Sequence, residues 1–328
     1  MIVISFFANI FGYVLNFLYE IIGNFGLAII LFSILAKIVM IPISISQQKN
    51  MKKSQKLNEE MKQIQFKYKN DPEKMNQEVM SLYKREKMNP FSGCLSAIVQ
   101  IVLLFAVFFL VRSPLTYMKK VDSNVIEKLE SYVQEQGSSS NYKEIAVINY
   151  INKVRNNEIT INNDNNNENK EENNEDNTSD SNNERINIED YIDVAYVNMS
   201  FLGLDLSKVP TEDLKDFKVL IIPILYVISS FISIRISTNV TQKSKKDNLL
   251  GDGKEKSKEE LNQLDPMASA NKSMSWFMPL MSISIALIAP LGLALYWLIN
   301  NILMIIERLV LNKFFNNDEK KEEATNNA

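Results

Sequence analysis

The sequence predicts an all-α integral membrane protein with five transmembrane helices, an N-terminal interfacial amphipathic helix and a cytoplasmic helical hairpin. Three observations lead to this class. Apolar residues gather in a few long uncharged tracts, the segments between them differ sharply in charge, and one of these segments has continuous helical periodicity. The mean hydropathy of −0.11 is typical of a soluble protein, but this average hides the separation into apolar and charged blocks.

Four apolar tracts predict the membrane spans. A helix needs about 20 apolar residues to cross a bilayer, and fewer where the membrane thins. The last tract, residues 276–306, carries no charge and is too long for one crossing; Pro290 and Gly292 mark a turn that divides it in two. A buried soluble core is the alternative for any single tract, but four tracts in one chain disfavour it. The predicted spans are residues 23–46, 92–115, 218–238, 273–289 and 290–311.

The first 22 residues form a separate case. They are mostly apolar, yet Asn9, Gly12, Asn16 and Glu20 recur every three or four residues and draw a narrow polar stripe on a helix. No basic residue precedes the apolar part and no small-residue cleavage site follows it, which disfavours a signal peptide. The pattern predicts an interfacial amphipathic helix over residues 1–22, with a sixth span as the alternative.

Charge predicts the orientation. Residues 47–93 hold eleven Lys and Arg against six Asp and Glu, whereas residues 116–217 hold ten against twenty-one. Short basic loops stay in the cytoplasm, so the first segment is expected inside and the second, extracytoplasmic segment outside. The cytoplasmic loop 239–272 and the cytoplasmic tail 312–328 follow on the inside, which gives an outside N-terminus and an inside C-terminus.

The sequence of residues 47–91 predicts two helices that form a cytoplasmic hairpin. Apolar residues fall at helical spacing on both sides of Asn70-Asp71-Pro72, where Asp71 can cap the second helix and Pro72 suits its first position. About forty residues of helical signal are more than a connector needs. We therefore favour a docking or gating element over a solvated linker.

Three further segments are predicted to lack fixed structure. Residues 156–187, within the extracytoplasmic segment, consist mainly of Asn, Glu and Asp with very few apolar residues, a composition typical of disorder. In addition, residues 247–266 of the cytoplasmic loop and residues 316–328 of the tail are expected to be flexible cytoplasmic segments. The stretches on either side of 156–187 carry some apolar periodicity and are expected to fold as a small external cap.

Composition excludes several classes of chemistry. The chain has no histidine and a single cysteine, Cys94. Histidine-dependent catalytic triads and thiolate zinc sites are therefore absent. No nucleophile with an adjacent base, phosphate-binding glycine loop or metal-ligand cluster is recognisable. We expect no enzyme activity, no catalytic residue, no metal and no cofactor.

Lys37 is the candidate functional charge. It lies about nine residues, or roughly 14 Å of helix rise, from the polar edge of its span at Ser46. A lysine can reach only part of that distance, and a charge at such depth is a functional candidate by default. The alternative is an ion pair inside the bundle, for which Glu307 is the one acidic residue within the spans.

Other polar residues fall within the predicted spans, and each is a weak signal alone because single polar residues often join helices. Together with Lys37 they are candidates to line a hydrated, substrate-binding groove. The candidate groove residues are Lys37, Gln100, Ser230, Ser233, Trp297 and Asn301.

The motifs around these positions resemble the YidC/Oxa family of membrane-protein insertases. The resembling segments are Asn24 to Gln55, Ile64 to Gln100 and Trp276 to Asn301, with the pattern KNDPEKMNQE in the hairpin and PLGLALYW in the last span. The resemblance implies a hydrophilic groove in the inner leaflet, open to cytoplasm and lipid and closed to the outside. It also implies that Lys37, where relatives usually carry arginine, attracts the acidic tail of a small substrate.

The function so implied is that of a membrane-protein insertase and folding chaperone in the bacterial cytoplasmic membrane. Implied partners are nascent membrane proteins, the ribosome, the Sec translocon and membrane lipids, with no nucleic-acid specificity. Two alternatives stay open from the residues alone. One is a small-molecule or ion carrier, and the other is an assembly factor that bridges ribosome and membrane through the hairpin.

Overall fold

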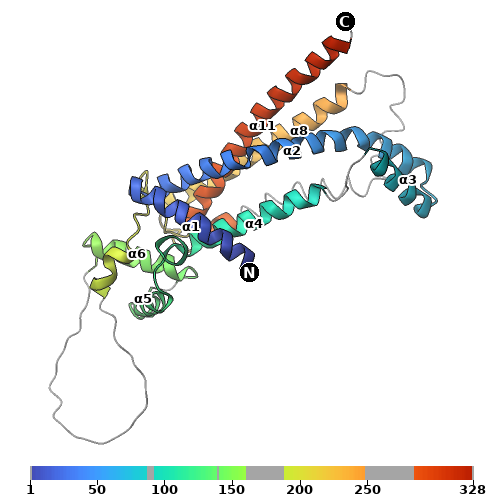
Figure 1. Cartoon of the computed structure of the whole chain (residues 1–328). Coiled ribbons are helices and arrows are strands. Elements are labelled where there is room, and N and C mark those ends of the chain that lie inside the picture. Colours follow the sequence, from blue (N-terminus) through green and yellow to red (C-terminus); the bar gives the residue numbers. More distant parts are fainter. Residues whose placement is uncertain (1, 87–91, 139, 160–187, 248–283, 327–328) are drawn as a thin grey trace, which may run out of the picture.

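The computed structural model describes residues 2–86, 92–138, 140–159, 188–247 and 284–326, which are mostly helical (Figure 1). The prediction of an all-α membrane protein is confirmed, because four helical segments of this described part are long and apolar enough to cross a bilayer. Most of the predicted fourth span, 273–289, lies outside the described residues, so the total of five spans stays a prediction. The four segments are Ile2–Ile22, Phe25–Asn50, Phe217–Ile236 and Leu291–Lys313, and Ile101–Arg112 is a shorter apolar helix.

The structure consists of long helices and a group of short elements. The long helices are α1 (Ile2–Ile22), α2 (Phe25–Lys67), α4 (Ser92–Arg112), α8 (Ile221–Asp247) and α11 (Leu291–Asn326), with α3 (Pro72–Arg85) between α2 and α4. The short elements lie between α4 and α8 in the sequence and are η1 (Leu115–Lys119), α5 (Ser123–Glu135), α6 (Lys143–Arg155), η2 (Ile188–Tyr191), α7 (Ile192–Ala195), strands β1 (Ser200–Phe201) and β2 (Leu204–Asp205), and η3 (Phe217–Leu220).

Helix α2 joins the first predicted span to the hairpin without a break at residue 46, and Pro42 lies inside it. The hairpin then turns as the sequence predicts: the Asp71 side chain accepts a hydrogen bond from the Lys74 N–H at 3.1 Å, and Pro72 is the first residue of α3. Leu57 of α2 and Leu82 of α3 are both buried, and Arg85 forms an ion pair with Glu60 across the two helices.

The last helix, α11, continues to Asn326. The prediction of a flexible end at residues 316–328 is therefore wrong for the part that the structure describes. The reason lies in the sequence itself, because Glu, Lys and Ala dominate residues 319–324 and all three are good helix formers. The predicted disordered segment 156–187 and most of the loop 239–272 lie outside the described residues.

Part of the polar stripe of α1 faces protein, since Gly12 is buried and Asn9 and Asn16 are partly buried, whereas Glu20 is exposed. A side chain in place of Gly12 would bring its Cβ within 1.9 Å of the Tyr117 carbonyl oxygen, so glycine is required for α1 to approach the backbone of η1. Next to it, Asn9 accepts a hydrogen bond from Lys120 Nζ at 2.5 Å. The opposite face exposes apolar side chains at helical spacing, among them Phe6, Tyr13 and Phe17. Whether α1 lies in the interface or spans the bilayer stays a prediction.

The short elements after η1 form a unit that we call the cap (residues 120–138, 140–159 and 188–220). It lies at the end of the bundle where α1 and α2 meet, opposite the hairpin of α2 and α3 (Figure 1). The cap holds the start of α2 through Asn198, whose carbonyl accepts from the Phe25 N–H at 3.0 Å. It also holds the start of α11, because the carbonyls of Leu206 and Lys208 accept from the N–H groups of Gly292 and Leu291, each at 2.9 Å. These bonds satisfy helix-terminal donors that have no partner within their own helix.

A buried carboxylate fixes the cap to the end of α4. Glu144 of α6 accepts three hydrogen bonds, from the Leu115 N–H at 2.8 Å, the Thr116 N–H at 3.0 Å and the Thr116 hydroxyl at 2.7 Å. Only 7% of the residue is exposed. Glu144 thus caps the π-helix η1, which continues the chain beyond α4.

Packing is uneven along the bundle. The buried core gathers at the cap end, where Phe25, Phe32, Leu110 and Leu293 join buried residues of the cap. Farther toward the hairpin burial falls: among the described side chains of α2, none between Ser33 and Leu57 is buried. The cap end is therefore closely packed, and the other half of the spanning region exposes much of its apolar surface.

We expect Glu144→Leu to lower the free energy of unfolding by about 2 kcal/mol or more. The substitution leaves three donors near Leu115 and Thr116 without their acceptor, and buried unsatisfied donors cost about 1–3 kcal/mol. The midpoint of thermal unfolding in detergent measures this loss. Glu127→Leu, at an exposed position of α5, is the matched control, and an equal loss in both variants would contradict the role given to Glu144.

The pH dependence of stability provides a second test of the same carboxylate. Burial raises the pKa of Glu144, and this effect outweighs the lowering by its hydrogen bonds. The folded chain therefore keeps a proton that the unfolded chain has released, so this group's contribution to stability declines as pH rises through the folded-state pKa. We expect Glu144→Gln to remove that part of the decline, as measured by unfolding midpoints from acidic to neutral pH.

Candidate functional site

Lys37 forms an ion pair inside the spanning region. Its Nζ lies 2.6 Å from Oε2 of Glu307, which reaches it from α11. The side chains are 22% and 14% exposed, respectively. Opposite charges taken out of water stabilise each other, which offsets part of their desolvation. The ion pair that the sequence left open as an alternative is thus present, and it joins α2 to α11.

The pair is not fully satisfied. Oε1 of Glu307 is buried and has no hydrogen-bond partner among the described residues. A carboxylate has about four acceptor positions, and buried polar atoms without partners are uncommon in folded proteins. One oxygen of Glu307 therefore binds Lys37 while the other retains unused hydrogen-bonding capacity.

Asn301 lies about one and a half turns of α11 closer to the cap and makes a different contact. Its amide donates to the hydroxyls of Ser229 at 2.9 Å and Ser230 at 3.1 Å, both on α8. Ser233, one turn farther along α8, is also buried. We call Asn301, Ser229 and Ser230 the serine–asparagine cluster. Its hydrogen bonds hold α8 against α11 within the span.

The predicted residues therefore fall into two groups. Asn301 and Ser230 meet directly, and Trp297 packs near them with its ring 6.3 Å from that of Tyr226. Lys37 lies apart with Glu307, and its helix makes a further polar contact from Gln48 to Asn312 at 3.1 Å. The side chain of Gln100 lies outside the described part, so its place in a groove stays a prediction.

Two site residues were missed by sequence reasoning. Glu307 was considered only as a partner, although a lone acidic residue within a span is as unusual as Lys37 itself. Ser229 was overlooked beside Ser230. Adjacent serines on a helix point about 100° apart, and only the packing of α11 against α8 shows that Asn301 bonds both of them.

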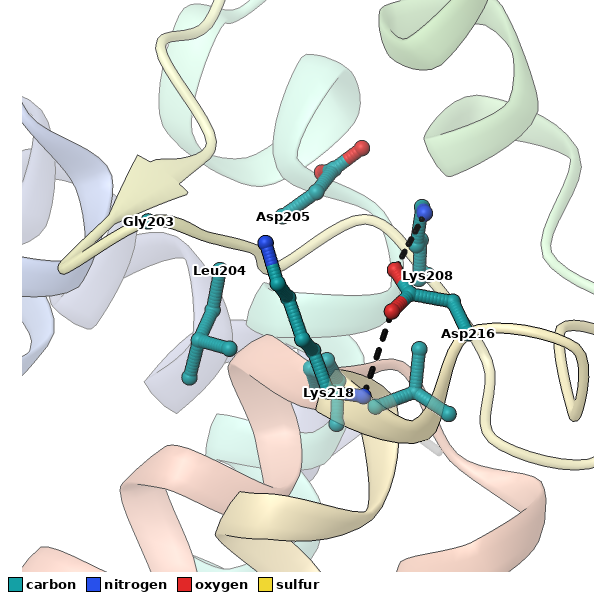
Figure 2. Close-up of a pocket in the computed structure, with 8 residues that line it drawn as sticks. Gly203, Leu204, Asp205, Lys208, Asp216 and Lys218 are labelled. Carbon is teal, nitrogen blue, oxygen red and sulfur yellow. Dashed lines mark hydrogen bonds and ion pairs between the residues drawn. The ribbon is translucent and has the colours of Figure 1, made fainter.

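A second polar region lies in the cap, where α8 and α11 begin. A cavity of about 230 Å³ is lined by Asp205, Lys208, Asp216, Lys218 and apolar neighbours (Figure 2). Lys208 Nζ lies 2.9 Å from Asp216 Oδ2, and this hydrogen bond is the main cause that raises the pKa of Lys208 and lowers that of Asp216. Asp216 also accepts from the Lys218 N–H at 3.1 Å, which caps η3. These bonds account for the loop geometry and make the cavity a structural feature of the cap.

Among the described residues, no group of three acidic or cysteine side chains is arranged to hold a metal ion. What the arrangement offers instead is a paired charge and a hydrogen-bonded amide between helices that are long enough to cross a membrane. This combination defines a polytopic membrane protein with polar contacts inside its spans.

Comparison with known protein families identifies the family of this membrane protein. The chain belongs to the 60Kd inner membrane protein family, whose model matches residues 17–320. The predicted YidC/Oxa membership is thereby confirmed, and the protein is a bacterial membrane protein.

Individual relatives agree with this assignment. A membrane protein insertase YidC of Fusobacterium nucleatum is 42% identical over 102 residues, which are 31% of this chain and 50% of the relative. The YidC proteins of Chlorobaculum parvum and Rickettsia prowazekii are 44% and 40% identical over 100 and 96 residues, in each case 17% of the relative. The chain thus matches half or less of the length of these relatives.

We expect Asn301→Leu to lower the free energy of unfolding by about 0.6–1.7 kcal/mol, because hydrogen bonds between membrane helices contribute about 0.6 kcal/mol on average and about 1.7 kcal/mol at most. The variant removes both hydrogen bonds to α8. Asn300→Leu is the matched control, because the neighbouring amide makes no hydrogen bond within the described residues. Unfolding in mixed micelles measures both variants, and an equal loss of stability would contradict the role of the serine–asparagine cluster.

Proposed function

We propose that the protein is a membrane-protein insertase and folding chaperone. It would pass small or single-span proteins from a hydrophilic inner-leaflet groove into the bilayer, with Lys37 attracting acidic substrate tails. The family assignment supports this proposal, as do the relatives named membrane protein insertase. The observation that carries it is the positive charge of Lys37 inside a span, held between α2 and α11.

The proposed orientation has the N-terminus and cap outside and the hairpin and C-terminus inside. The basic charge of residues 47–93 and the acidic charge of residues 116–217 support it, since basic loops stay in the cytoplasm. In this orientation α2, α8 and α11 run from the outside inward, and their closely packed ends lie at the outer surface.

The uneven packing supports a route that opens inward and sideways. At the cap end, the core around Phe25 and Leu110 closes the bundle. Toward the hairpin, apolar side chains of α2 and α11 are exposed, including Val39 and Leu309. A polypeptide that arrives from the inside would meet a charged position bordered by apolar helix surface. Apolar substrate residues could then move along that surface into lipid, which is the favourable step.

No covalent step is part of the proposed mechanism. Transfer of a polar tail is eased when its path through hydrocarbon is shortened by hydrated side chains or a thinned bilayer. With an inside-negative potential, an acidic residue that moves outward gains about 2.3 kcal/mol per 100 mV. The potential and the burial of the apolar segment would therefore drive insertion without nucleotide hydrolysis.

The hairpin is proposed as the docking element for the ribosome or the Sec translocon. Its two helices bury Leu57 and Leu82 and are joined by the exposed Arg85–Glu60 ion pair. The outer surface of α3 stays polar and exposed at Asn76, Gln77 and Lys84. A helical, basic and exposed element is suited to bind a large partner outside the membrane.

We expect Lys37→Ala to reduce insertion of an acidic-tailed single-span protein at least about tenfold, equivalent to about 1.4 kcal/mol. Lys37→Arg should retain activity because it keeps the charge. Insertion into vesicles that contain the purified protein measures the effect, with Lys153→Ala, an exposed cap lysine, as control. Equal insertion by Lys37→Ala and wild type would remove Lys37 from the mechanism.

Site-specific crosslinking separates the insertase from a ribosome–membrane assembly factor. Photoreactive groups at positions 100 and 297 should capture ribosome-bound nascent chains if these positions line the route. Capture at the hairpin alone would favour the assembly factor. Substrate flux of a small molecule or ion through the reconstituted protein would instead indicate a carrier.

A further inference from the structure

We propose that Glu307 is a built-in substitute for the substrate carboxylate, which occupies Lys37 until an acidic substrate segment displaces it. This inference rests on the proposed function, because it assumes that Lys37 attracts acidic tails. It adds a residue that determines specificity: insertion of acidic tails would depend on how well they compete with the protein's own glutamate.

The geometry makes this competition direct. Glu307 binds Lys37 through the same ammonium group that a substrate carboxylate would use, at 2.6 Å. Lysine is a compact point charge, and a second carboxylate beside the first would place two negative charges at one partly buried position. Like charges so close disfavour each other strongly. An arriving carboxylate must therefore replace Glu307 at Lys37.

The position of the pair allows a polypeptide to reach it. Exposed apolar side chains border it on both helices, Ile38 and Val39 on α2 and Ile306 and Val310 on α11, and each is at least half exposed. The pair thus lies at the edge of the contact between two helices, beside the lipid-facing surface. A substrate segment could approach from that side without separating α2 from α11.

Glu307 itself is suited to be displaced. Its Oε1 has no hydrogen-bond partner among the described residues. Lys37 provides the ion pair of Glu307, and the neighbouring Arg308 adds a coulombic attraction. About nine ångströms of helix rise separate it from Lys313, where the candidate span ends. The contact between Gln48 and Asn312 would keep the two helices together after the pair opens.

This arrangement has two consequences. In the resting protein neither charge is left unpaired within the membrane, which avoids the high cost of an isolated buried charge. For substrates it sets a threshold, because a tail must bind Lys37 better than Glu307 does. The apparent affinity of every acidic tail is lowered in proportion to the fraction of molecules whose lysine is available.

The test compares insertion of two single-span peptides by the full chain in vesicles. One peptide carries a single aspartate in its tail and the other an asparagine at the same position. If the pair is closed in about nine molecules of ten, Glu307→Gln should raise insertion of the aspartate peptide about tenfold at subsaturating concentration. Insertion of the asparagine peptide should not change. Asp193→Asn, which removes a carboxylate from an exposed ion pair with Arg155 in the cap, should leave both unchanged.

The outcomes separate this inference from the function on which it rests. If Lys37→Ala lowers insertion of the aspartate peptide while Glu307→Gln leaves it unchanged or lowers it, the insertase role of Lys37 stands and the competition by Glu307 is refuted. If Lys37→Ala has no effect, the role of Lys37 itself fails. If Glu307→Gln does not fold, Glu307→Asp is the second variant, because it keeps the negative charge on a shorter side chain. It must raise insertion of the aspartate peptide by less than tenfold and leave insertion of the asparagine peptide unchanged. Lack of that gain refutes the inference.

Discussion

A charge within a membrane span must be paired or hydrated, and this constraint connects the main features of the protein. Lys37 meets it through Glu307, and the pair joins α2 to α11 where few side chains are buried. Nearer the cap, the same two helices are held by apolar packing around Phe25 and Phe32. The electrostatic contact therefore lies at the boundary between a closely packed half of the bundle and a more open one. A site that receives an acidic polypeptide, as proposed, would need both the positive charge of Lys37 and a surface from which the polypeptide can reach it.

The cap explains why one half is closed. It supplies acceptors to the starts of α2 and α11 and binds the end of α4 through Glu144. Helix ends would otherwise leave polar groups without partners at the membrane boundary. By satisfying them, the cap fixes the mutual position of α2, α4 and α11 at one end. Toward the hairpin, the contact between Gln48 and Asn312 joins α2 to α11.

Local sequence signals predicted much of the helical architecture. Asp71 and Pro72 mark the start of α3 by capping chemistry that acts within one turn, and Lys37 is conspicuous because a charge in an apolar tract is rare. The predicted groove residues that the structure describes do not form one cluster. Lys37 lies with Glu307, whereas Asn301 and Ser230 form a separate cluster. Contacts between residues 37 and 307, or 144 and 115, depend on how distant helices pack, and periodicity carries no information about that.

The sequence by itself determined the class of protein, the helical hairpin and the presence of one unusual positive charge, because hydropathy, capping and charge act locally or as sums along the chain. The tertiary structure alone decided which partner that charge has and where the bundle is closed. Pairing of Lys37 with Glu307 requires two helices far apart in sequence to meet at one depth and rotation, and closure at the cap requires Asn198, Leu206 and Lys208 to present their carbonyls to helix ends. Both follow from packing in three dimensions.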